Sequence, residues 1–400
     1  MKKGVPMPGS TPMVVVEADD ALWQEYQDLT VRAYGHQVED VARLRAHADA
    51  RVAVRDGRVI GGGLALAVPQ FFGGRPVPGA CLAGGCIAPE ARGSRLWSTL
   101  LKERLRPLKE QGAVLATAWT TSTGYGHRMG WAAPSRVYSW TVPTDELRGI
   151  ADGSRFDIVH GADDQARKQQ QELADDWNGP WQRPSWWPAW QQAEHPGMTH
   201  YRFALPSPTP DGLLAIAFDR DRAGGRRLVV HDFWAATAET ATAMLGFLGR
   251  HHSRIPTVMF QRTALPPVPL LQNHLRHAGA ASATSWHPWM LRVLDPAEAV
   301  RRRGWPEDLD LTIPLALRGD DNSPSAPMLL RVTAGAGDLT PHPGARHELG
   351  LTSRQFAHWY AGGYRTPAAA LLDGVHGEPR LVAQLVRATA DREPWMPEYF

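Results

Sequence analysis

The segment CIAPEARGSRLWSTLL, residues 86–101, contains residue types that can bind a phosphate group. A short apolar run leads into a turn flanked by Arg92 and Arg95, and a helical pattern begins at Leu96. The backbone N–H groups in the first turn of a helix and two guanidinium groups can together hold an anion. Arg95 and Trp97 stand where close approach of backbone to phosphate would favour small residues. The segment therefore predicts an anion-binding turn of unusual composition.

Strand and helix signals alternate around this segment, which indicates an α/β fold. Apolar residues from Leu22 to Ala33 recur at helical spacing, and strand patterns in residues 51–68 flank the turn pair Asp56-Gly57. The GGG at 61–63 is interpreted as a kink at a strand end, because it lacks the Lys-Ser/Thr of a nucleotide-binding loop. Further expected features are a strand at 14–16, a Gly/Pro loop at 70–80, a helix to about Gln111, a strand at 113–120 and a turn at 121–131.

The order of hairpin, helix and strand recurs in a second unit. Residues 213–236 indicate a hairpin that turns at Gly224-Gly225, and Thr237 can cap the helix that follows. This helix lacks a basic, glycine-containing turn before it, so the second copy is expected to lack the phosphate-binding device. Residues 141–165 are interpreted as the linker between the two copies.

A third unit begins near residue 290 and combines strand patterns with short helices. Thr352 and Gln355 have the spacing of a helix capping box. The chain then ends in an apolar and acidic tail, DREPWMPEYF, whose last residue is Phe400. Its aromatic content favours docking of this tail over fraying.

Composition excludes several classes of protein. The net charge of the 400 residues is +2, which argues against a dedicated nucleic-acid binder. Two cysteines five positions apart do not make a disulfide framework, and the 16 histidines lack the spacing of metal ligands, so no metal is expected. The sequence shows neither a signal peptide nor an apolar stretch long enough for a membrane helix. We therefore expect a soluble, cytoplasmic protein without a membrane partner.

The whole chain resembles the Eis (enhanced intracellular survival) family of GNAT-superfamily N-acetyltransferases. The resemblance is carried by IAPEAR, HRMGW, VHDFWAATAETATAMLGFL, WMLRVLDPAEAVRRRGW, TSRQFAHWYAGGYRTP and the terminal PWMPEYF. It implies a mixed α/β (α+β) chain with two GNAT-like domains at 1–145 and 146–290. A sterol-carrier-like domain at 291–400 would follow, with a tail that reaches the active site. It also implies a homo-oligomer, with a hexamer as the assembly expected from this family.

The resemblance implies an acetyl-CoA-dependent enzyme that acetylates an amine of a small polar molecule, aminoglycoside-like or peptide-like. The thioester would bind along the strand edge and the pyrophosphate at the turn before the helix. The residues that correspond to this cofactor site are Cys86, Ile87, Ala88, Arg92, Gly93, Ser94, Arg95 and Leu96. Arg92 matches the leading arginine of the family's loop, whereas Arg95 stands at its glycine position.

Two further family features concern catalysis. The family places a tyrosine acid four residues before a Gly-aromatic pair, here Gly130-Trp131; Tyr125 stands one residue early, and His127 is the alternative acid. The carboxylate of the terminal residue, here Phe400, would take the proton from the attacking amine.

Aromatic residues and one acid are the candidates for the substrate pocket: Trp23, Tyr26, Tyr34, Phe71, Phe72 and Glu398. The loop glycine and the acid tyrosine of the family's acetyl-CoA site are both displaced in this sequence, since Arg95 stands at the first position and Tyr125 is one residue early. A second hypothesis therefore remains. In it the scaffold has lost acetyl-CoA and binds or transforms a specialised metabolite. A third hypothesis, a non-enzymatic carrier, has only the sterol-carrier resemblance to support it.

Overall fold

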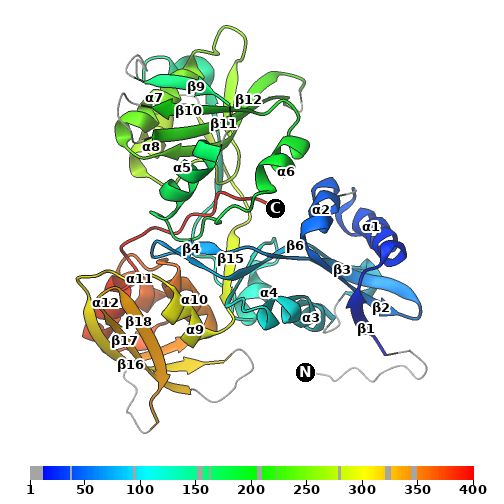
Figure 1. Cartoon of the computed structure of the whole chain (residues 1–400), viewed down its shortest axis with the longest axis vertical. Helices are drawn as coiled ribbons and strands as arrows, with labels where there is room; N and C mark the ends of the chain where they lie inside the picture. Colours follow the sequence, from blue (N-terminus) through cyan, green and yellow to red (C-terminus); the bar gives the residue numbers. More distant parts are fainter. Residues whose placement is uncertain are drawn as a thin grey trace. The chain divides into compact units, whose positions relative to one another are not determined.

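The structure is a computed structural model that describes residues 12–36, 38–92, 96–150, 156–161, 164–204, 210–221, 223–277, 281–319, 326–343 and 349–400. The chain divides into two compact units. Figure 1 labels the helices and strands that form them. The first comprises Met1–Pro69, Pro78–Trp119 and the terminal residue Phe400. The second comprises Gln70–Val77 and Thr120–Tyr399.

The first unit is built on a sheet whose strands lie in the order β1-β2-β3-β6-β7. All neighbours are antiparallel except β6 and β7, which are parallel. Asp19 caps the first helix by accepting a hydrogen bond from the Leu22 N–H, as its side-chain chemistry favours. The elements are β1 (Val14–Glu17), α1 (Asp20–Tyr34), α2 (Glu39–Leu44), β2 (Asp49–Arg55), β3 (Arg58–Ala67), β6 (Gly79–Ile87), α3 (Leu96–Glu110) and β7 (Leu115–Trp119).

The sequence prediction of this unit is largely confirmed. Asp56 and Gly57 turn the β2–β3 hairpin, both with positive φ. The interpretation of the GGG as a strand-end kink is wrong, because residues 61–63 lie inside β3. A Cβ on Gly62 would lie 2.5 Å from the Tyr26 ring, and one on Gly63 would lie 2.5 Å from the Arg104 guanidinium. Successive strand residues face opposite sides, so these glycines admit a side chain of α1 on one face and of α3 on the other.

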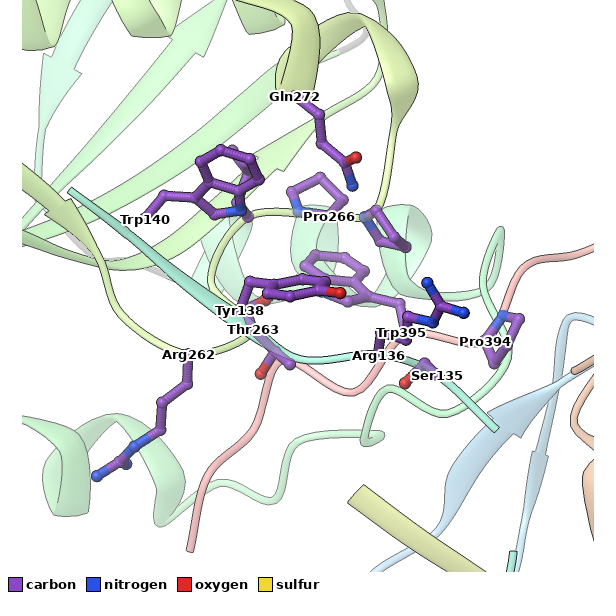
Figure 2. Close-up of a pocket in the computed structure, with 12 residues that line it drawn as sticks. Ser135, Arg136, Tyr138, Trp140, Arg262, Thr263, Pro266, Gln272, Pro394 and Trp395 are labelled. Carbon is purple, nitrogen blue, oxygen red and sulfur yellow. The ribbon is translucent and has the colours of Figure 1, made fainter. Parts of the chain in front are cut away.

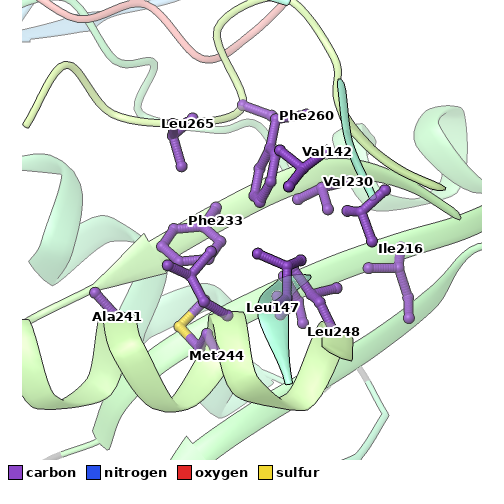
Figure 3. Packing of buried hydrophobic residues seen from close by; sticks show 14 of the residues in the cluster. Val142, Leu147, Ile216, Val230, Phe233, Ala241, Met244, Leu248, Phe260 and Leu265 are labelled. Atoms are coloured by element: carbon purple, nitrogen blue, oxygen red, sulfur yellow. The ribbon is translucent and has the colours of Figure 1, made fainter. Parts of the chain in front are cut away.

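A seven-stranded sheet in the order β14-β8-β13-β12-β11-β10-β9 forms the first part of the second unit. Its core is apolar, and Figure 3 shows Phe233, Met244 and Phe260 packed together there. Thr237 caps the central helix as predicted, by accepting from the Thr240 N–H. The elements are β8 (Tyr138–Pro143), β9 (Asp157–His160), α5 (Asp164–Ala174), α6 (Trp187–Glu194), β10 (Thr199–Ala204), β11 (Pro210–Arg220), β12 (Arg226–Ala235), α7 (Ala238–Gly249), β13 (Thr257–Phe260), α8 (Pro269–His277) and β14 (Ser282–Ser285).

The rest of the second unit contains a five-stranded sheet in the order β18-β17-β16-β19-β20. The predicted capping box is confirmed: Thr352 and Gln355 bond each other's backbone at the start of α10. The elements are β15 (Trp289–Val293), α9 (Pro296–Arg302), β16 (Asp310–Arg318), β17 (Ala326–Thr333), β18 (Ala336–Pro341), β19 (Leu349–Thr352), α10 (Ser353–Tyr360), α11 (Pro367–Leu372), β20 (His376–Gly377) and α12 (Pro379–Arg387).

Three segments expected to be irregular carry regular structure instead. The expected linker at 141–165 includes the end of β8, which pairs with β13 inside the seven-stranded sheet, and all of β9. The Gly/Pro loop at 70–80 contains a hairpin of β4 (Gln70–Phe72) and β5 (Arg75–Val77). The turn at 121–131 contains the helix α4 (Thr123–Arg128). Strands β8 and β9 pair with strands distant in sequence, whereas β4 pairs with its neighbour β5 and α4 is a single short helix, which the glycines of these segments concealed.

Candidate active site

Strand β6 is longer than its pairing with β7, and we call the region beyond the paired residues the opening between β6 and β7. The paired residues run from Gly79 with Leu115 to Leu82 with Ala118, whereas β6 continues to Ile87. The last five residues of β6 therefore extend beyond the described pairing with β7. A strand end without a neighbour on one side can accept an extended ligand along its edge, and the N-terminus of the helix that follows can accept an anion.

A β-bulge distorts β6 within this opening. Gly62 is opposite Cys86 and Leu64 is opposite Ala83, so Gly84 and Gly85 together face a single residue of β3. Gly84 has a φ of +60°, which glycine adopts without strain.

Side chains donate hydrogen bonds to the backbone carbonyl oxygens around the bulge. The Tyr26 hydroxyl donates to the Gly84 carbonyl, and the Tyr34 hydroxyl donates to that of Gly85 at 2.6 Å. The buried Arg104 guanidinium donates to the carbonyls of Ala83, at 2.8 Å, and Leu64, at 2.5 Å. These bonds fix the direction of the β6 backbone at the opening.

The helix α3 begins at Leu96, as the sequence predicted. Arg92 is exposed before it, and its guanidinium lies 3.4 Å from the Ala33 carbonyl oxygen. Trp97 packs against the bulge, since a Cβ on Gly85 would lie 2.6 Å from its ring. The predicted cofactor residues Gly93, Ser94 and Arg95 lie outside the described residues.

Strand β6 contains two cysteines, and Cys86 is the one that lies beyond the residues paired with β7. It is buried, and burial raises its pKa to about 12. At neutral pH the sulfur is therefore protonated and is a poor nucleophile. Ile87 and Ala88, the other predicted strand-edge residues, end β6 and begin the turn to α3; the Ala88 N–H bonds the Ile60 carbonyl.

The predicted substrate residues fall in both units. In the first unit, Trp23 and Tyr26 are buried with ring centroids 5.1 Å apart, whereas Tyr34 is partly exposed. In the second unit, Phe72 is fully buried with its ring centroid 5.1 Å from that of Tyr360, and Phe71 lies in an apolar cluster. Trp23, Tyr26, Phe71 and Phe72 thus contribute to packing, while Tyr34 offers an accessible aromatic surface.

The two candidate acids lie on α4 of the second unit. Tyr125 is half-buried, with the Arg128 guanidinium 5.5 Å from its ring centroid. His127 has a pKa that is lowered by partial burial and then by the nearby Arg354 guanidinium, an effect that Asp373 partly offsets. A lowered pKa makes His127 mainly neutral at pH 7.

The tail residue Glu398 is fully buried rather than open to a cationic substrate. Its carboxylate accepts hydrogen bonds from Arg183 Nε at 2.8 Å and from the Trp181 N–H at 3.0 Å. Arg183 also donates through both Nη atoms to Asp232, at 2.8 and 2.6 Å. The charge of Glu398 is therefore compensated inside the second unit.

We call Arg183, Asp232 and Glu398 the Arg183 cluster; the sequence analysis found only its tail member. A cavity of about 70 Å³ adjoins it, lined mostly by apolar groups such as Trp187 and Trp234. A smaller one of about 20 Å³ lies where the tail passes Arg262 and Thr263, and Figure 2 shows the Trp395 indole beside Tyr138 there. Among the described residues, no group of three or more His, Cys, Asp or Glu side chains is placed to hold a metal.

Comparison with protein families gives three matches in chain order. Residues 15–133 and residues 179–293 each match an acetyltransferase (GNAT) domain, by two different family models. Residues 296–397 match a sterol carrier protein domain. No curated protein matches the sequence. None of the described helices combines the length and apolar character that crossing a membrane requires.

Solved structures resemble the chain over nearly its whole length. A GCN5-related N-acetyltransferase from Anabaena variabilis has a TM-score of 0.84 at 22% identity, covering 97% of this chain and 100% of its own. One from Kribbella flavida has a TM-score of 0.79 at 23% identity, covering 97% and 98%. Eis1 from Mycobacterium abscessus has a TM-score of 0.72 at 17% identity, covering 97% and 100%. At these identities the likeness is one of fold, and it agrees with the expected α/β architecture.

Proposed function

We propose that this chain, which matches two acetyltransferase (GNAT) domains and a sterol carrier protein domain and resembles the Eis family, transfers an acetyl group from acetyl-CoA to an amine of a small polar molecule. The observation that carries this proposal is the opening between β6 and β7, which leads to the N-terminus of α3. The residues present fit the cofactor: a strand edge for its thioester arm, and a helix N-terminus with Arg92 for its phosphates.

The chemistry of this chain favours direct transfer. Acetyl-CoA supplies the activated acyl group. Cys86 is the thiol on the strand edge, and its raised pKa of about 12 disfavours an acyl-cysteine intermediate. The amine would therefore attack the thioester itself, and the N–H groups of the β6 edge would stabilise the oxyanion.

Two proton transfers complete the reaction. We assign the base to the terminal carboxylate of Phe400, and its support is that this residue belongs to the first compact unit, apart from Tyr399 and the rest of the tail. The acid that protonates the leaving thiolate is Tyr125 or His127. The variants Tyr125→Phe and His127→Gln, made separately, distinguish them, because only loss of the acid should lower kcat.

Calorimetric titration of the purified protein with acetyl-CoA, with free CoA as a control, tests the cofactor. Binding in the micromolar range supports the proposal, and a panel of aminoglycosides and amine-bearing peptides is then assayed for acetylation. Absence of binding at millimolar acetyl-CoA contradicts it and favours the second hypothesis, a scaffold that acts on a specialised metabolite without CoA. Deletion of Phe400 alone should abolish turnover and leave acetyl-CoA binding intact.

We further propose domain boundaries near residues 145 and 290, a homohexameric assembly and a cytoplasmic location. The family resemblance supports the boundaries and the hexamer, and the low cysteine content supports the cytoplasmic location. Light scattering coupled to size-exclusion chromatography measures the assembly; a monomeric mass of 44.0 kDa would contradict the hexamer.

A further inference from the structure

The second acetyltransferase domain has the same backbone opening as the first. Its parallel strands β12 and β13 pair from Arg227 with Thr257 to Val230 with Phe260, and β12 then continues to Ala235. The register between β11 and β12 shifts at this point, so that His231 lies in a bulge. The continuation of the first strand beyond its parallel partner and the bulge, which mark the proposed thioester site, are therefore both present in the second domain.

The protein's own tail occupies this second opening. The ring centroid of Trp395 lies 4.6 Å from that of Trp234 on β12. On the other side, Trp395 Nε1 donates to the carbonyl of Thr263, three residues after β13, at 2.7 Å. Trp395 is buried, and its backbone N–H also bonds the Asn178 carbonyl at 2.9 Å. One side chain thus spans the continuations of both strands.

The Arg183 cluster holds the tail three residues further on. Each of the three guanidinium nitrogens of Arg183 donates to a carboxylate: Nε to Glu398, and the two Nη atoms to Asp232. Glu398 lies in the tail, Asp232 lies on β12 inside the opening, and all three side chains are buried or nearly so. Such charge-assisted bonds in a buried site have narrow geometric tolerance.

Tyr399 is held as well, with the Arg262 guanidinium carbon 3.2 Å from its ring centroid. Glu398 is two residues from the terminus, and two residues of extended chain span roughly 7 Å. Fixing Glu398 therefore confines the terminal carboxylate of Phe400 to a small volume.

We propose that the second acetyltransferase domain is a docking site for residues 395–399, which fill the opening between β12 and β13, and that Arg183 is the positioning residue for the Phe400 carboxylate. The docking stands on the contacts above, while its catalytic consequence rests on the proposed function. In the domain that lacks the predicted phosphate-binding turn, a segment of the same chain thus lies where the first domain is proposed to bind acetyl-CoA.

Glu398→Gln is the key variant, because it keeps the size of the side chain and leaves the Arg183–Asp232 pair intact. Glu393→Gln is the matched control in the same tail, outside the Arg183 cluster. The first readout is the release of Phe400 by a carboxypeptidase, followed by mass spectrometry. We expect release about 10-fold or more faster for Glu398→Gln than for the unmodified protein, and unchanged for Glu393→Gln.

The second readout separates positioning from stability. We expect kcat to fall about 10-fold in Glu398→Gln, with KM for acetyl-CoA unchanged, and Glu398→Asp, which keeps the charge, to recover part of the loss. Release at the native rate in Glu398→Gln, or equally fast release in Glu393→Gln, would overturn the docking role. Faster release with an unchanged kcat would overturn the positioning role.

The two proposals fail differently. If no amine is acetylated by the unmodified protein, the proposed function fails, while the carboxypeptidase result still decides whether Arg183 holds the tail. Arg183→Lys provides a second variant: it keeps a cation between the two carboxylates but loses the three-nitrogen geometry, and should release Phe400 at a rate between those of the unmodified protein and Glu398→Gln.

Discussion

The hydroxyl of Tyr26 on α1 donates a hydrogen bond to the carbonyl oxygen of Gly84 in the bulge of β6. A Cβ at Gly84 would lie 2.6 Å from that same hydroxyl oxygen and 2.8 Å from Val41, and the residue has a φ of +60°. Gly84→Ala should therefore lower the free energy of unfolding by about 3 kcal/mol, from backbone strain plus overpacking. Urea denaturation measures the change.

Gly35→Ala is the matched control for this substitution. Gly35 also has a positive φ, +84°, but a Cβ there would meet nothing within 4 Å. It should cost only about 1 kcal/mol, the cost of the left-handed conformation alone. Equal losses at both positions would mean that the contact with Tyr26 does not constrain the bulge.

Arg92→Ala tests the anion-binding turn. Arg92 is exposed before α3, where a guanidinium can pair with a phosphate group. We expect KM for acetyl-CoA to rise about 5- to 10-fold with the amine KM unchanged, as for the loss of one exposed charge-assisted contact. Steady-state kinetics over both substrates decides, with the exposed Arg58→Ala as control. A change confined to the amine parameters would remove Arg92 from the cofactor site.

Asn178→Ala tests a buried junction in the second unit. Its side chain accepts from the Gly73 N–H at 2.8 Å and donates to the carbonyls of Ala361 and Arg392 at 3.1 and 3.2 Å. Truncation removes three hydrogen bonds, one of them fully buried, while the Arg392 carbonyl keeps its bond from Arg365 at 3.2 Å, so we expect a loss of roughly 2–4 kcal/mol in the free energy of unfolding. Thermal unfolding followed by tryptophan fluorescence measures it. A loss under about 0.5 kcal/mol would show that other groups or water replace the amide.

The pH dependence of stability should reflect His231 on β12. Its pKa is lowered to about 3 by burial and then by the neighbouring His195, whose ring centroid is 3.9 Å away. Below about pH 6.5 the unfolded chain binds a proton at this residue that the folded chain does not, so acid lowers stability until the pH reaches the folded pKa. The slope is about 1.4 kcal/mol per pH unit.

The measurement compares urea denaturation at pH 8, 6.5 and 5 for the unmodified protein and His231→Gln. The substitution should reduce the stability lost between pH 6.5 and 5 by about 2 kcal/mol. Data at pH 8, above this window, supply the change caused by altered packing alone. Parallel curves for both proteins would contradict a neutral, buried His231.

Periodicity and capping residues predicted the regular elements well, because these signals are local. The hairpin at Asp56-Gly57, the start of α3 at Leu96, the Thr237 cap and the capping box at Thr352 all follow from residues within one turn of each other. The domain order followed from resemblance, and the family matches agree with it.

Two of the errors share a different cause, which is an interaction between residues far apart in the chain. The expected linker includes a strand because Val142 pairs with Val258, a relationship that no local pattern encodes. Likewise, Glu398 was expected to face a substrate, whereas Arg183, 215 positions earlier, binds it. The sequence alone does not distinguish an acidic side chain that is open to a ligand from one that is already paired with a buried cation.

The burial of Trp395 also bears on how the second acetyltransferase domain is protected. Its indole packs against Trp177 and Trp234, so these aromatic rings are covered only while the segment that carries Trp395 is in place. Proteolytic cleavage before Trp395 would therefore expose aromatic surface and, in the same event, remove the carboxylate proposed for catalysis. Protection of the apolar surface and competence for the reaction thus depend on the same few residues.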